Sequence, residues 1–123
     1  MPNRPKYLNL LQIRMPVTAL VSIMHRASGA MLFLALPLLL WGWQISLTSV
    51  DTYSAFRTLA SHGLVKLIML GLLWGYVHHV CAGIRHLVMD LDMATDLGSA
   101  RLTSKLVLAV SVGATIVAGI VLW

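Results

Sequence analysis

The stretch that decides the fold is GLLWGYVHHVCAGIRHLVMD, residues 71–90, which begins as an apolar helix and ends with three histidines and an arginine. Four residues recur at every fourth position and therefore share one side of a helix: Gly71, Gly75, His79 and Gly83. Glycines at this spacing let a neighbouring backbone or a flat ligand approach closely, and a histidine inside a membrane is costly unless it is bonded or ligates. A haem edge would satisfy both requirements, so this side of the helix is the first candidate site.

The composition excludes an ordinary soluble domain, because 59% of the 123 residues are hydrophobic and only 11% are charged. Crossing the hydrocarbon layer takes about 20 predominantly apolar residues as a helix. The chain offers three such segments, at about residues 17–47, 63–89 and 106–123. We therefore predict an all-α membrane protein, a single membrane-anchor domain over residues 1–123, with three transmembrane helices and an interfacial arm at residues 1–16.

The basic residues sit mostly at the ends of the apolar segments, where nine Lys and Arg outnumber four acidic residues. This distribution indicates orientation and anchoring in a lipid membrane and argues against nucleic-acid binding. More of the basic residues precede the first segment or follow the second than lie between them. The positive-inside rule therefore predicts a cytoplasmic N-terminus.

Near the start of the first segment, four residues at offsets of three, four and seven share one helical face: Ser22, His25, Arg26 and Gly29. One interpretation is an interfacial His and Arg that extend toward lipid headgroups. The other is a site in which a hydroxyl, an imidazole and a guanidinium bind an oxygen-bearing or anionic group that enters from the membrane edge.

His78 and His79 cannot face the same way, since adjacent helical positions differ by about 100°. His79 shares its side with the glycines and is the ligand candidate, whereas His78 is expected to bond a neighbouring helix. Either histidine is also compatible with a packing role. His86 lies about 10 Å along the axis from His79, too far to bind the same iron but suited to a haem propionate.

The chain resembles the cytochrome b subunit family of succinate dehydrogenase, the larger of two small membrane anchors in bacterial respiratory complex II. The resemblance rests on four segments in this order: RPKYLNL at 4–10, IRMPVTAL at 13–20, SIMHRASG at 22–29 and HVCAGIRHLVMD at 79–90. Each segment is short, but their order and spacing together are specific to the family and cover nearly the whole chain.

The resemblance implies that His79 is an axial ligand of haem b iron, with the second axial ligand supplied by a second small membrane anchor subunit. It implies that Ser22 and Arg26 line a ubiquinone pocket, and that His25, Arg26 and His86 lie near the haem propionates. The three helices would pack with the second anchor into a helical bundle.

The same resemblance implies a subunit of succinate dehydrogenase in the bacterial inner membrane, which passes electrons from an iron-sulfur subunit to ubiquinone. Succinate oxidation itself would belong to a flavoprotein subunit. Two alternatives from other classes are a haem-free structural anchor and a small transporter subunit. A two-haem anchor would need at least four deep histidines, and this chain has too few.

Overall fold

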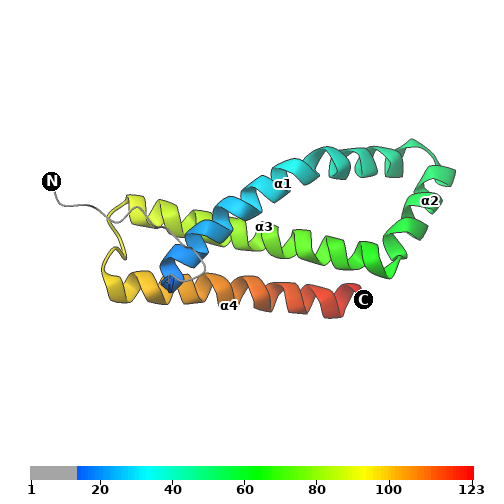
Figure 1. The fold of residues 1–123 in the computed structure, drawn as a ribbon. Helices are drawn as coiled ribbons and strands as arrows, with labels where there is room; N and C mark the ends of the chain where they lie inside the picture. The colour runs from blue at the N-terminus through cyan, green and yellow to red at the C-terminus, as the bar shows by residue number, and fades with distance from the viewer. Residues whose placement is uncertain (1–13) are drawn as a thin grey trace, which may run out of the picture.

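The computed structural model describes residues 14–123, and its regular structure within that range is entirely helical (Figure 1). The helices are α1 (Val17–Thr48), α2 (Val50–Ser61), α3 (Gly63–Asp90) and α4 (Leu97–Leu122). Three of them, α1, α3 and α4, are long and apolar enough to cross a membrane, which confirms the predicted fold class. Most of the predicted interfacial arm, residues 1–13, lies outside the described residues.

The polar connection after α3 is shorter than the sequence suggested. α4 begins at Leu97 instead of near residue 106, so much of the segment between residues 90 and 104 is a helix extension. Asp96 caps this helix by accepting a hydrogen bond from the Ser99 backbone N–H at 2.9 Å. Hydrogen bonds from the side chain and backbone of Ser99 also hold the pKa of the exposed Asp96 carboxyl below its usual range.

α3 is the central element, because it packs against α1 on one side and α4 on another. A small core forms where the three helices meet, at Val21, Ala82 and Val107. On α4 the buried positions recur at offsets of four and three, and most are small: Ala100, Ser104, Val107 and Ser111. Small residues let the helix backbones approach closely, which is how helices associate in lipid, where apolar burial offers little gain.

α1 crosses α3 obliquely and then turns away from it, and α2 leads the chain back (Figure 1). The second half of α1 bends (Figure 1). Pro37 lies in this half and has no N–H for the helical hydrogen bond, which accounts for the bend. Ser49 and Thr52 form a capping box that starts α2. His62, between α2 and α3, is exposed.

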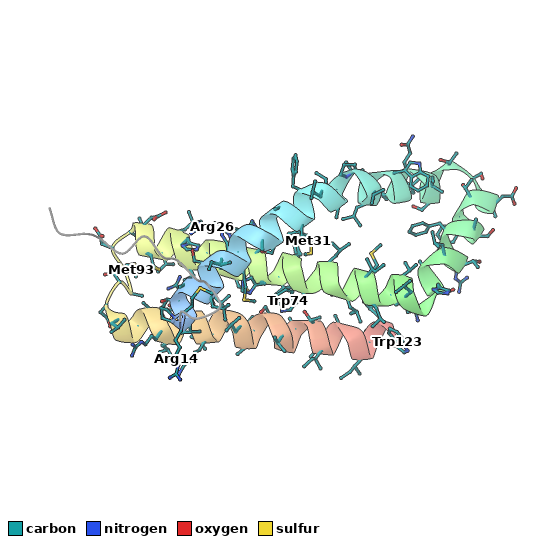
Figure 2. The ribbon with its side chains drawn as sticks, in the orientation of Figure 1. Arg14, Arg26, Met31, Trp74, Met93 and Trp123 are labelled. Carbon is teal, nitrogen blue, oxygen red and sulfur yellow. The ribbon has the colours of Figure 1, made fainter. Side chains whose placement is uncertain are left out.

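The two ends of the bundle differ in their side chains. Figure 2 shows Arg14, Arg26 and Met93 near one end and Trp123 near the other. At the Trp123 end, the Lys66 ammonium lies 5.1 Å from the centre of the indole ring, a cation–π contact of the kind found at membrane interfaces. His25 precedes Arg26 on α1 and contacts the rings of His79 and His86 on α3, so these histidines lie toward the end marked by Arg26.

We expect Ala82→Leu to destabilise the bundle, because residue 82 is fully buried where α1, α3 and α4 meet. Overpacking a tight site of this kind typically costs about 1–3 kcal/mol. Thermal unfolding of the purified protein in detergent, followed by circular dichroism, measures the effect. Ile84→Leu, at a position 57% exposed on the same helix, is the matched control. Equal melting temperatures for the two variants would contradict the packing described.

Candidate functional site

The imidazole of His79 lies between α3 and α1. Its ring stacks on that of His25, with centroids 4.2 Å apart and planes inclined by 13°. Gly29 makes this position possible, because a Cβ at residue 29 would lie only 2.7 Å from Cε1 of His79. The glycine that makes space for the His79 ring is therefore Gly29 of α1, and not one of the glycines of α3.

The hydrogen bonds of His79 define which ring nitrogen carries the proton. Nδ1 lies 3.0 Å from the backbone carbonyl oxygen of His25 and 3.3 Å from the Ser28 hydroxyl. A carbonyl oxygen can only accept, so the neutral ring is protonated at Nδ1 and donates to it. The lone pair of the neutral ring then lies on Nε2, which has no hydrogen-bond partner within residues 14–123.

A third imidazole extends this cluster toward the α3–α4 connection. The ring of His86 is 5.1 Å from that of His25 and is tilted by 51°. Gly83 lies beside the cluster, and a Cβ there would make an ordinary van der Waals contact with Nε2 of His25, at 3.5 Å. Three predicted site residues, His25, His79 and His86, are thus brought together from α1 and α3.

Much of the glycine-marked side of α3 is covered by α1 instead of forming an open groove. A Cβ at Gly75 would collide with the side chain of Met31, whereas Gly71 has open space around it. The glycines of α3 could accommodate either a neighbouring helix or a flat ligand. In this structure the neighbouring helix α1 covers most of their side.

Ser22 and Arg26 form a pair beside the histidines on α1. The Arg26 guanidinium donates a long hydrogen bond of 3.5 Å to the Ser22 hydroxyl. Ser22 is half-buried and Arg26 is exposed, so most of the guanidinium donors face outward. The pair offers a hydroxyl and a fixed positive charge to a polar group near this end of the bundle.

His78 lies apart from these residues, as the sequence analysis required. It is fully buried, and its ring stacks on Trp74 with centroids 5.4 Å apart. Neither of its nitrogens has a hydrogen-bond partner in the described part of the chain. Its expected bond to a neighbouring helix is therefore not found within hydrogen-bonding distance among these residues.

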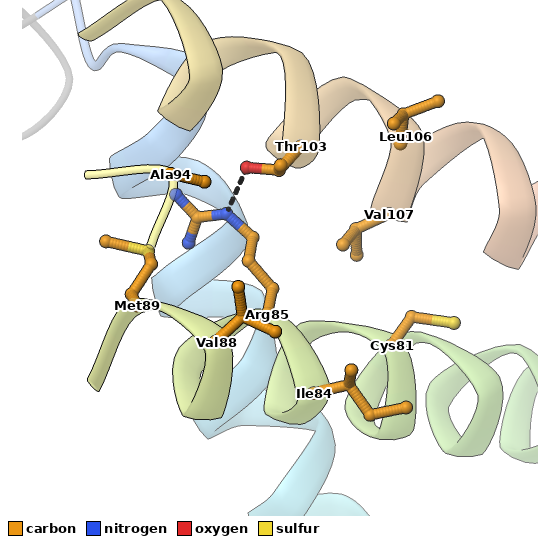
Figure 3. A pocket seen from close by; sticks show the side chains of 9 residues that line it. All are labelled: Cys81, Ile84, Arg85, Val88, Met89, Ala94, Thr103, Leu106 and Val107. Atoms are coloured by element: carbon orange, nitrogen blue, oxygen red, sulfur yellow. Dashed lines mark hydrogen bonds between the residues drawn. The ribbon is translucent and has the colours of Figure 1, made fainter. Parts of the chain in front are cut away.

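Arg85 is a structural residue that the sequence did not single out. It is 7% exposed, and its guanidinium crosses from α3 to α4 (Figure 3). Nε donates to the Thr103 hydroxyl at 3.1 Å, and Nη2 donates to the Ala100 carbonyl at 3.3 Å. Its register, three residues after the buried Ala82, is consistent with this role, but nothing in the sequence alone indicated that this side of α3 meets α4.

A small helical membrane subunit with three spans, carrying a histidine cluster and an exposed arginine near one end, is the class that the fold and site define. The chain belongs to the succinate dehydrogenase/fumarate reductase transmembrane subunit family, whose pattern it matches over residues 1–118.

Three relatives are named as cytochrome b subunits of succinate dehydrogenase. The b556 subunit of Coxiella burnetii is 35% identical over 98% of this chain and 97% of its own length. The b556 subunit of Paracoccus denitrificans is 30% identical, over 89% of this chain and 85% of its own length. The b560 subunit of Reclinomonas americana is 32% identical, over 97% and 86% of the two lengths.

We expect Arg85→Gln to lower the melting temperature of the complex, because it removes a buried, charged link between α3 and α4. Hydrogen bonds from a charged group typically contribute about 1.5–3 kcal/mol each. Thermal unfolding in detergent measures the loss, with Arg101→Gln as the control, since Arg101 is exposed on α4. Equal melting temperatures for the two variants would show that the hydrogen bonds of Arg85 contribute nothing to the stability of the complex.

Proposed function

We propose that this chain is a haem b-containing membrane anchor of succinate:ubiquinone oxidoreductase, in which His79 is an axial ligand of the haem iron. The observation that carries the proposal is the hydrogen bond from His79 Nδ1 to the His25 carbonyl at 3.0 Å. Metal-ligating histidines typically donate their second ring N–H in this way, which fixes the tautomer and orients the other nitrogen toward the metal. The names of the relatives as cytochrome b subunits agree with it.

The donor set suits haem better than a bare metal ion. Within residues 14–123 no group of three or more His, Cys or Asp side chains is arranged to hold an ion. Haem iron takes four equatorial ligands from the porphyrin and needs only axial ones from protein. His79 would provide one, and a second small membrane anchor subunit would provide the other.

The residues around His79 fit the haem's negatively charged propionates. His25 and His86 are in ring contact, and Arg26 follows His25 along α1. A guanidinium and imidazole N–H groups offset the cost of holding carboxylates near the membrane edge. When bound, the haem supplies a one-electron carrier between an iron-sulfur subunit and the quinone.

Ser22 and Arg26 would bind ubiquinone near the same end. The Ser22 hydroxyl would donate a hydrogen bond to one quinone carbonyl, and the Arg26 guanidinium would stabilise the negative charge that develops there as the quinone is reduced. Their mutual hydrogen bond orients both groups before the quinone arrives. Two protons complete the reduction to quinol.

The distribution of basic residues supports an N-terminus on the cytoplasmic side of a bacterial inner membrane. The iron-sulfur subunit, and the flavoprotein subunit that oxidises succinate, would then dock on the end that carries Arg26 and His86. Electrons would enter close to both the haem and the quinone.

We expect His79→Ala to abolish or alter the low-spin b-type band in the reduced-minus-oxidised visible spectrum of the purified complex. His78→Phe is the control, because the buried His78 ring makes no hydrogen bond in the described structure and a phenyl ring retains the stacking on Trp74. A wild-type complex without haem would favour the haem-free anchor. A band that is lost only in the His78 variant would move the ligand to His78.

We expect Arg26→Gln to lower kcat/KM for a short-chain ubiquinone by about 10- to 100-fold, the size expected for losing a hydrogen bond from a charged group. Succinate oxidation with a soluble dye acceptor is the internal control, since it bypasses the quinone and should not change. Unchanged quinone kinetics would exclude Arg26 from the quinone pocket.

A further inference from the structure

We propose that Ser28 is a positioning residue for His79, holding the imidazole in the tautomer and orientation that iron ligation needs. This inference rests on the proposed function, because it assigns a role toward the same haem. Ser28 lies on α1 and is 4% exposed. Its hydroxyl contacts two partners, the His25 carbonyl on its own helix and the His79 ring on α3.

Buried serines in membrane helices usually bond a carbonyl of the preceding turn and serve only packing. Two serines of α4 do this: Ser104 donates to the Ala100 carbonyl at 2.8 Å and Ser111 to the Leu108 carbonyl at 3.1 Å. Ser28 donates in the same way to the His25 carbonyl, at 2.9 Å. It differs because its oxygen also lies 3.3 Å from an imidazole nitrogen of another helix.

Three atoms lie within hydrogen-bonding distance of one another: the Ser28 hydroxyl oxygen, the His25 carbonyl oxygen and Nδ1 of His79. Only one placement of the hydrogens satisfies all three contacts. The Ser28 proton goes to the His25 carbonyl, so the Ser28 oxygen presents its lone pairs to His79. The Nδ1–H of His79 is then shared between two acceptors, the carbonyl and the hydroxyl oxygen. Two acceptors on one N–H exclude the other neutral tautomer and restrict rotation of the ring about its Cβ–Cγ bond.

The arrangement affects the iron through the ring. An acceptor on Nδ1–H increases the electron density that the imidazole donates from Nε2, and this stabilises ferric haem over ferrous haem. Removing the Ser28 oxygen should therefore raise the haem midpoint potential. The ring plane should also change, because the carbonyl alone remains as a restraint.

The test compares Ser28→Ala with Ser111→Ala in the whole purified complex. Ser111 is fully buried and bonds its own helix, so its variant matches the loss of a buried hydroxyl without touching His79. We expect only Ser28→Ala to shift the midpoint potential upward in a redox titration and to shift the largest g value of the low-spin ferric haem in electron paramagnetic resonance. Loss of haem from an assembled complex in Ser28→Ala alone would also support the role.

A Ser28→Ala complex with wild-type potential and g values would overturn the inference while leaving haem ligation by His79 intact. The same result for both serine variants, whether a shift or a loss of haem, would overturn it too, because it would mark a general effect of a buried hydroxyl. Absence of haem from the wild-type complex would overturn the proposed function itself, and this inference with it.

Discussion

The arrangement of the site depends on the close approach of α1 and α3 where the His79 ring lies over Gly29. This approach brings a ring nitrogen within hydrogen-bonding distance of a backbone carbonyl on the other helix. In lipid, helix association relies on such packing and hydrogen bonds, since burying apolar groups offers little gain over the lipid itself. The same contact therefore joins two helices and fixes the orientation of the His79 ring.

The buried polar side chains of the bundle differ in whether they have hydrogen-bond partners. Arg85 and the buried serines of α4 have partners within the helices, so the charge and hydroxyls are compensated. His78 has none among the described residues, and an unbonded buried polar group costs about 1–3 kcal/mol. Its stacking on Trp74 offsets part of that, since aromatic pairs contribute about 0.5–1.5 kcal/mol.

The chemistry is concentrated near one end of the bundle. The histidine cluster and the Ser22–Arg26 pair belong to the first half of α1 and the second half of α3, and the Arg85 link joins the second half of α3 to the first half of α4. The other end carries the Lys66–Trp123 contact, which is typical of an interface anchor. The candidate site is therefore at the end where α3 packs against both α1 and α4, while α1 turns away from α3 at the opposite end.

The sequence alone determined the three long apolar helices and the residues proposed for the candidate site, because long apolar runs have few alternatives in a membrane and helical periodicity puts His79 on a different side from His78. It also placed Ser22, His25 and Arg26 on one face. It left open whether the polar residues after Asp96 form a loop or a helix extension, and the structure shows that α4 already begins at Leu97. Only the tertiary structure decided that α1 covers the glycine side of α3, that Arg85 reaches α4, and that the His25 carbonyl and Ser28 meet His79. These contacts join residues far apart in the chain, and periodicity within one helix carries no information about which neighbour its face will meet.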